Sequence, residues 1–328
     1  MNAGNMSQLI KLQLGVFLIC LPGTAYLVAQ DLDPRAYVKA PVNGTLLIGG
    51  YAHSEGGVLT DPTLPLENLE ATANVTTLGV ARTFALLGKS AQVLYVLPYS
   101  WAEASALVNG QPQSTSRSGF ADMRLRLSVL LLGGKAVGMS DFLKENKRTI
   151  IGTSLMVIAP TGQYFPDRLI NLGTRRWSFK PEVALSQKIG KRWMLDFYTG
   201  VWLFTNNDSF YPGNSLRTQD PMVAFQTHFS YTINPRMWVA FNATYYSGGQ
   251  SSVNEVHKDD RQSNARMGAT LVVPAGKRSA LRIAYSRGAV IRIGADFSTI
   301  SVGWTTSWFR NKRPMNSNRL SEQFLTIL

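Results

Sequence analysis

Trp177–Phe204 reads W-S-F-K-P-E-V-A-L-S-Q-K, then I-G-K-R, then W-M-L-D-F-Y-T-G-V-W-L-F. In both arms, large apolar side chains occupy one parity and polar or small ones the other, as Val183 and Leu185 do against Glu182 and Ser186. Alternation with period two predicts two β-strands, each with an apolar and a polar face. Each arm has roughly 10 to 12 residues, enough to cross a bilayer at a tilt. The hairpin therefore fits a panel of a soluble sandwich or of a membrane barrel.

The composition allows a membrane barrel but no helical membrane bundle. The chain has 328 residues, 45% of them hydrophobic, and a mean hydropathy of −0.03. No run of 18 or more apolar residues follows residue 30, which excludes helical spans beyond that point. A transmembrane β-barrel needs only every second residue to be apolar, so its mean hydropathy stays near neutral.

The net charge of +13 comes from Lys and Arg residues that are scattered along the chain. A nucleic-acid-binding protein would collect them on one face. We therefore expect no nucleic-acid partner and assign the charge to loops and tails near anionic lipid.

Residues 1–29 have the pattern of a secretory signal peptide. Lys11 precedes an apolar core at Leu12–Leu21, and cleavage is expected after Ala25 or Ala29. The alternative, a membrane anchor, is disfavoured because the apolar core is short. We therefore predict an exported protein.

Segments of alternating polarity recur from residue 43 to residue 309 and predict a single domain. Twelve strands are expected, an even number that is typical of single-chain bacterial barrels. We expect the barrel domain to span residues 30–309, beginning with a polar lead-in at 31–42, and a basic extension to follow at 310–328. The expected strands are 43–54, 68–87, 90–106, 119–132, 148–160, 174–188, 192–204, 220–233, 236–248, 262–274, 278–287 and 296–309.

The connections between these strands alternate in length. Every odd-numbered connection is a loop, including 107–118, and every even-numbered one except the fourth is a tight turn. The fourth, Gly133–Lys147, has the composition of a small helix at Asp141–Glu145. Outer-membrane barrels alternate short periplasmic turns with longer outer loops. A sandwich has no reason to keep this parity, so the fold class is an antiparallel up-and-down transmembrane β-barrel.

Charged residues share the polar parity of several strands. An arginine facing lipid costs roughly 2–4 kcal/mol at the midplane, so these residues are expected to line the lumen. We expect six of them, Asp122, Arg124, Arg126, Lys180, Glu182 and Asp196, to reach across the lumen as a charged constriction that selects solutes. The alternative is mutual neutralisation that stiffens a plugged lumen. The predicted lining residues are Asp122, Arg124, Arg126, Lys180, Glu182, Asp196, Arg266 and Arg282.

Four tryptophans near strand ends, Trp177, Trp193, Trp304 and Trp308, are predicted membrane-interface anchors. The alternative is that they are ordinary core aromatics. Ile300–Phe309 resembles the aromatic-ended last strand that the outer-membrane barrel-assembly machinery reads, although the tail at 310–328 follows it. Outer-membrane lipids, lipopolysaccharide and this machinery are therefore expected partners.

The sequence contains no phosphate loop, dinucleotide fingerprint or His-Glu-x-x-His motif. Cys20 lies in the signal peptide, so the mature chain offers neither a disulfide nor a cysteine metal site. His228, beside Ser230 on a polar face, is the one candidate for a Ser-His-acid site, and a solvated lumen histidine is the favoured interpretation. We expect no catalytic residue, metal or cofactor.

Five ordered stretches resemble the outer-membrane barrel family named for the MetA pathway of phenol degradation. They span nearly the whole mature chain and are Gln30–Tyr37, Gly119–Ser128, Pro160–Tyr164, Asn171–Glu182 and Arg236–Tyr246. The resemblance implies an outer-membrane barrel of a Gram-negative bacterium that passes small aromatic or other apolar compounds.

Three functions remain open at this point. The first is a channel for small, aromatic or otherwise hydrophobic solutes through a charged lumen. The second is an outer-membrane enzyme using His228, which needs a nucleophile within hydrogen-bond reach of the imidazole. The third is a structural or surface-binding barrel that acts through outer loops, particularly 205–219 and 249–261.

Overall fold

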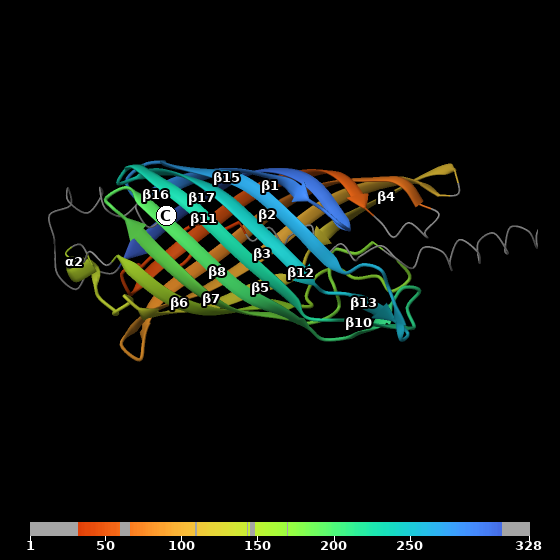
Figure 1. Cartoon of the computed structure of the whole chain (residues 1–328), viewed down its shortest axis with the longest axis horizontal. Coiled ribbons are helices and arrows are strands. Elements are labelled where there is room, and N and C mark those ends of the chain that lie inside the picture. Colours follow the sequence, from red (N-terminus) through yellow and green to blue (C-terminus); the bar gives the residue numbers. More distant parts are fainter. Residues whose placement is uncertain are drawn as a thin grey trace, which may run out of the picture.

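The computed structural model describes residues 32–59, 66–108, 110–142, 144, 148–168 and 170–309. These residues form one closed antiparallel β-barrel whose strands cross the long axis at a tilt (Figure 1). The expected signal peptide and the extension at 310–328 lie outside the described residues. No helix in the described part of the chain is long and apolar enough to cross a membrane.

Twelve strand positions make up the barrel wall, as the alternation predicts. The strands are β1 (Gly44–Leu59), β2 (Leu66–Leu86), β3 (Lys89–Val108), β4 (Gln111–Phe120) continued by β5 (Met123–Leu132), β6 (Thr149–Ala159), β7 (Ser178–Ile189), β8 (Trp193–Phe204), β11 (Met222–Asn234), β12 (Met237–Gly248), β15 (Gln262–Pro274), β16 (Ser279–Val290) and β17 (Gly294–Phe309). Each pairs with its neighbours in chain order, and β1 closes the ring by pairing with β17 from Gly44↔Phe309 to Leu59↔Gly294.

The two ends of the barrel differ. The turn end carries the tight connections and α2 (Met139–Phe142), the one-turn helix of the fourth connection, and β17 ends there (Figure 1). The loop end carries a separate small sheet built by β9 (Asn207–Phe210), β10 (Ser215–Gln219), β13 (Ser251–Val253) and β14 (Val256–His257). Alternation is too short in these segments to have predicted this sheet.

The prediction of a loop at 107–118 is wrong. β3 runs to Val108 and β4 begins at Gln111, so the two strands form a long hairpin beyond the rest of the wall. The polar segment Q-P-Q-S-T-S-R-S-G has no apolar alternation, so the sequence alone predicts a loop there. Within the described residues β4 has a strand partner on one side only, β3, whereas β5 pairs with both β3 and β6.

The barrel is inside-out compared with a soluble one, as predicted. Large apolar residues such as Phe225 and Phe241 are about half exposed on the outer surface, while Glu182, Asp196 and Asn242 are buried inside. The apolar surface therefore faces outward, where a bilayer would cover it.

Residues 32–43 run inside the barrel, whereas the sequence predicts only a polar lead-in at 31–42. At the turn end, Asn43 N donates to the Thr83 carbonyl (2.9 Å) and Thr83 Oγ1 donates to the Pro41 carbonyl (2.7 Å). Farther in, Arg282 Nη2 donates to the Leu32 carbonyl (2.7 Å). We call residues 32–43 the N-terminal segment.

Candidate functional site

Glu182, on the inner face of β7, lies at the centre of a polar cluster in the lumen. The phenol of Tyr37 donates to its Oε1 (2.8 Å), and Gln226 Nε2 donates to its Oε2 (3.0 Å). Lys180 Nζ lies 2.9 Å from Oε2 and Arg126 Nη2 lies 3.6 Å from Oε1. Strand alternation explains this geometry, because Lys180 and Glu182 are two residues apart and so share the inner face.

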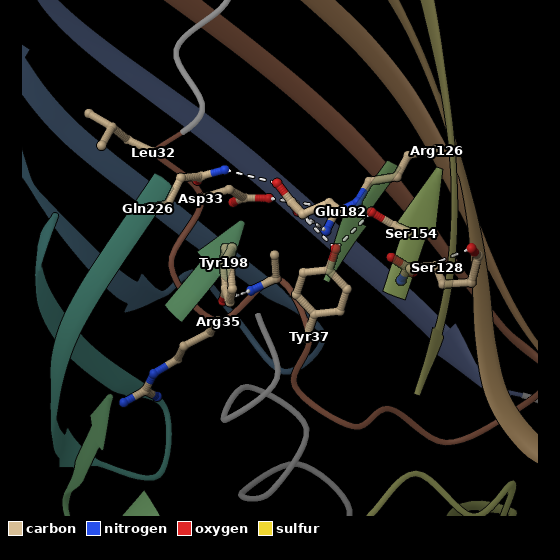
Figure 2. A network of polar contacts seen from close by, with 12 residues as sticks. Leu32, Asp33, Arg35, Tyr37, Arg126, Ser128, Ser154, Glu182, Tyr198 and Gln226 are labelled. Carbon is tan, nitrogen blue, oxygen red and sulfur yellow. Dashed lines mark hydrogen bonds and ion pairs between the residues drawn. The ribbon is translucent and has the colours of Figure 1, made fainter. Parts of the chain in front are cut away.

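The N-terminal segment supplies the other half of this cluster (Figure 2). Asp33 Oδ1 accepts a hydrogen bond from Arg282 Nη1 (2.6 Å), and Asp33 Oδ2 lies 3.8 Å from Arg126 Nη1. Tyr37 also hydrogen-bonds Ser154 (2.7 Å) through its hydroxyl, and its ring lies under the Arg126 guanidinium at 4.7 Å. The segment is therefore tied to β5, β6, β7 and β16 at once.

Arg35 extends from the same segment toward the opposite wall (Figure 2). Its Nε donates to Ser230 Oγ (3.0 Å) and its Nη2 to Thr232 Oγ1 (2.8 Å), while the guanidinium lies 4.5 Å from the ring of Trp238. The Arg35 amide donates to Asp196 Oδ2 at 3.3 Å. Tyr37 and Arg35 thus hold the segment across the lumen from two sides.

The wall leaves room for the segment at Gly152 of β6. A Cβ built on Gly152 would lie 2.5 Å from Cδ1 of Tyr37, closer than real Cβ atoms approach. Only glycine at this position lets the Tyr37 ring rest against the backbone of the wall.

Three cavities follow one another along the lumen. The turn-end cavity and the central cavity share Asp33, Arg126 and Arg282, and the central cavity shares Arg124 with the loop-end cavity. The cavities hold about 170, 440 and 110 Å³ respectively. The N-terminal segment narrows the lumen without filling it.

Aromatic side chains form part of the wall of the loop-end cavity. Trp202 and Phe204 of β8 stack with ring centroids 6.5 Å apart, flanked by Lys180 at 5.2 Å from the Trp202 ring and Arg176 at 4.5 Å from the Phe204 ring. Met222, Tyr246 and Phe297 add further apolar lining. Pockets of this kind, apolar with a few polar groups, are typical of small-molecule sites.

The structure distributes the eight predicted lining residues over three regions. Arg126, Lys180 and Glu182 meet at the central cluster, and Arg282 joins it through Asp33. Arg124 and Arg266 line the loop-end cavity. Asp196 is buried against the amide of Arg35.

Asp122 lines the loop-end cavity with Arg124 but is not brought to the central cluster. Its Oδ1 accepts from Gly162 N (2.9 Å) and its Oδ2 from Thr174 N (2.8 Å) and Thr174 Oγ1 (2.6 Å). It therefore fastens the loop between β6 and β7 to the break between β4 and β5.

His228 does not form the Ser-His-acid site. Its Nδ1 pairs with Asn242 Oδ1 (2.9 Å), and its buried Nε2 has no hydrogen-bond partner among the described residues. The ring lies against Tyr198 with centroids 5.1 Å apart. No group of three or more His, Cys, Asp or Glu side chains in the described part of the chain is placed to hold a metal ion.

All four predicted anchors point outward. Trp177, Trp193, Trp304 and Trp308 are 40–45% exposed. Trp177 precedes β7 at the loop end, while Trp193 begins β8 at the turn end and stacks on Phe229 with centroids 4.6 Å apart. Their role at the membrane interface stays a prediction.

Sequence reasoning missed the residues that the segment and the loop-end cavity contribute. They are Asp33, Arg35, Tyr37, Arg176, Trp202, Phe204, Met222 and Tyr246. The signal available was the stretch Gln30–Tyr37, which carried part of the family resemblance but not its location. The β8 alternation that predicts Asp196 inside the lumen also places Trp202 there, because the two residues share a parity.

An inside-out barrel with a polar lumen defines an outer-membrane β-barrel protein. Residues 54–289 match the model of the family described as "Putative MetA-pathway of phenol degradation". The chain belongs to this family. The sequence has no match among functionally curated proteins.

The fold is shared with a solved structure. The chain is similar to the COG4313 outer membrane channel from Pseudomonas putida F1, with a TM-score of 0.73, 20% identity, and coverage of 85% of this chain and 100% of that one. The transport unit of the autotransporter AIDA-I from Escherichia coli gives a TM-score of 0.49 at 9% identity, covering 94% of this chain and 100% of that one. The CymD monoaromatic hydrocarbon channel gives 0.39 at 7% identity, with 83% and 90% covered. The last two are too distant to carry an argument.

Proposed function

We propose that this protein is an outer-membrane channel for small, aromatic or otherwise hydrophobic solutes. The observation that carries the proposal is the row of three cavities, each sharing lining residues with the next. Solutes would enter the apolar loop-end cavity, pass Arg124 into the central cavity, and leave beside the N-terminal segment. The family description and the similar outer membrane channel from Pseudomonas putida support a channel function.

The central cluster is the proposed constriction. Arg126, Lys180 and Glu182 from the wall and Asp33 and Tyr37 from the segment would together set the width and charge of the passage. Of the six residues predicted to form the constriction, Arg126, Lys180 and Glu182 remain in it. Asp33 and Tyr37 of the N-terminal segment complete it. Selectivity follows from the diameter and the lining charges.

Conductance and uptake test the proposal. Purified protein in planar bilayers should give discrete conductance steps, and proteoliposomes should swell in solutions of small solutes. Arg126→Ala, at the constriction, should change conductance or charge preference, whereas Arg192→Ala, in the β7–β8 turn, should change neither. Protein that is folded yet gives no steps and no swelling would overturn the channel proposal.

The surface-binding alternative also has an observation in its favour. The loop-end sheet of β9, β10, β13 and β14 is an ordered platform outside the barrel wall. A barrel that works only through this platform would be folded and electrically silent, so the same recordings separate the two functions. The expected contacts with lipids, lipopolysaccharide and the barrel-assembly machinery belong to either function.

A further inference from the structure

The loop-end cavity combines an aromatic wall with an excess of positive charge. Three arginines line it, Arg124 of β5, Arg176 in the loop before β7, and Arg266 of β15. Among the described lining residues Asp122 is the one carboxylate, and both of its oxygens accept hydrogen bonds from the loop at Gly162 and Thr174. The formal charge of the lining is therefore three positive against one negative. The carboxylate of Asp296, on the neighbouring part of β17, belongs to an exposed residue that does not line the cavity, although its charge acts on Arg266.

Arg266 presents an unused donor in this setting. Its Nη2 donates to the Phe297 carbonyl at 2.6 Å. Its Nε is buried and has no hydrogen-bond partner among the described residues. Leaving a buried donor unsatisfied is unfavourable, and a guanidinium is suited to a carboxylate because its donors lie in one rigid plane.

The size of the cavity fits one aromatic ring. Its volume is about 110 Å³, comparable with the ~150 Å³ apolar cavity that binds benzene. The stacked pair Trp202 and Phe204 offers the ring an aromatic wall, beside which the Arg176 guanidinium lies 4.5 Å from the centroid of the Phe204 ring. A cavity that buries guanidinium groups beside aromatic rings matches a ligand with an apolar body and one negative end.

We propose that the loop-end cavity is a binding site for small aromatic carboxylates. The ring lies along Trp202 and Phe204, and the carboxylate meets Arg266 and Arg124. The inference names the class of solute for the proposed channel. Only the passage of the bound solute onward through the lumen rests on that proposed function. Onward from the cavity, Arg124 also lines the central cavity, and Arg126 and Arg282 line both the central and the turn-end cavities.

Four probes separate the two halves of the site. Isothermal titration of the full-length mature protein in detergent would compare benzoate, benzyl alcohol, acetate and benzylammonium. Benzoate carries ring and charge, benzyl alcohol the ring alone, acetate the charge alone, and benzylammonium the ring with the opposite charge. Benzoate should bind at least about tenfold more tightly than each of the others, since one charge-assisted hydrogen bond contributes ~1.5–3 kcal/mol.

Variants assign that preference to the cavity. Arg266→Gln and Arg124→Gln should each weaken benzoate binding by about tenfold and leave benzyl alcohol unchanged, and Arg266→Lys should retain part of the preference because the charge remains. Arg287→Gln is the matched control, since it removes the same charge from an exposed residue near the loop end of β16. Heat modifiability on gels confirms that each variant is folded.

The outcomes separate this inference from the channel proposal. Equal binding of benzoate and benzyl alcohol, binding unaffected by Arg266→Gln, or no binding of any probe would each overturn the aromatic-carboxylate site. Such a protein could still conduct ions and pass neutral solutes, which would leave the channel intact. Conversely, benzoate binding without conductance would support the site and overturn the channel.

Discussion

Glu182 shows how much a single side chain can organise in a lumen. Its carboxylate meets Lys180 at 2.9 Å, Tyr37 at 2.8 Å, Gln226 at 3.0 Å and Arg126 at 3.6 Å. Two of these partners are cations that would otherwise be buried without an acid between them. The carboxylate therefore stabilises both the wall and the N-terminal segment.

Glu182→Gln should destabilise the protein strongly. The substitution keeps the shape of the side chain but leaves Lys180 and Arg126 facing each other without the negative charge. Removing one partner of a buried ion pair costs about 3–5 kcal/mol, and urea unfolding from detergent micelles or vesicles would measure the loss. Glu103→Gln, which alters an exposed carboxylate on β3, should change stability by less than about 0.5 kcal/mol. Equal effects for both variants would contradict the central role of Glu182.

At the residue scale, alternation predicts the direction of a side chain but not its partner. The parity of β5 and β7 was sufficient to place Arg126, Lys180 and Glu182 inside the barrel. The contact between Tyr37 and Glu182 joins residues 145 positions apart in the sequence. Such a contact depends on where the segment runs once the barrel has closed, which no local pattern contains.

At the element scale, the twelve strands were predictable because each carries its own period-two signal. The polar β4 lacks that signal and was missed, and β9, β10, β13 and β14 have at most five residues each. The N-terminal segment shows neither the two-residue period of a strand nor the 3.6-residue period of a helix. Its place inside the lumen therefore comes only from tertiary contacts. The aromatic wall of the loop-end cavity depends in turn on where several such elements meet.

Releasing the N-terminal segment should widen the channel. Arg35→Ala combined with Tyr37→Ala removes the contacts to Ser230, Thr232, Ser154 and Glu182 while leaving the barrel wall paired. Single-channel conductance should rise by at least roughly twofold, because the lumen of a barrel this size is only moderately wider than one filled by side chains. Unchanged conductance would mean that the segment does not limit the passage.

Gly152→Ala should also displace the N-terminal segment and widen the channel. The added methyl group would lie 2.5 Å from the Tyr37 ring and would push the segment away without altering any group that holds it. We expect conductance to increase in the same direction as in the double variant. Gly190→Ala is a control for the added methyl group, since Gly190 is in the β7–β8 turn and a Cβ there meets nothing within 4 Å. Its positive φ makes local strain its main effect, so its conductance should equal that of the wild type.

At the scale of the whole molecule, exposed apolar residues occur in two different environments. Phe241, in the middle of β12, is 56% exposed on the outside of the barrel, and Val256, in the loop-end sheet, is 59% exposed. We expect the first to face hydrocarbon and the second to face water. Exposure alone does not distinguish them, but their position along the barrel does.

Substitution by arginine should separate these two sites. Phe241→Arg should reduce the free energy of folding into lipid vesicles by about 2–4 kcal/mol, whereas Val256→Arg should change it by ~0–1 kcal/mol. Reversible urea titration in vesicles would measure both. Similar costs at the two positions would contradict the membrane placement of the outer face.

The one-sided pairing of β4 limits how deeply this barrel can sit in the hydrocarbon of its membrane. Inside hydrocarbon, each backbone group without a hydrogen bond would cost several kcal/mol, so the ten residues of β4 have to stand above it. The boundary falls near Phe120, where Gln163 N reaches the Phe120 carbonyl (2.8 Å) and where Tyr99 packs edge-on against the Phe120 ring. We therefore predict that the hairpin of β3 and β4 stands outside the hydrocarbon, so that its unpaired edge marks how deeply the barrel sits in its membrane.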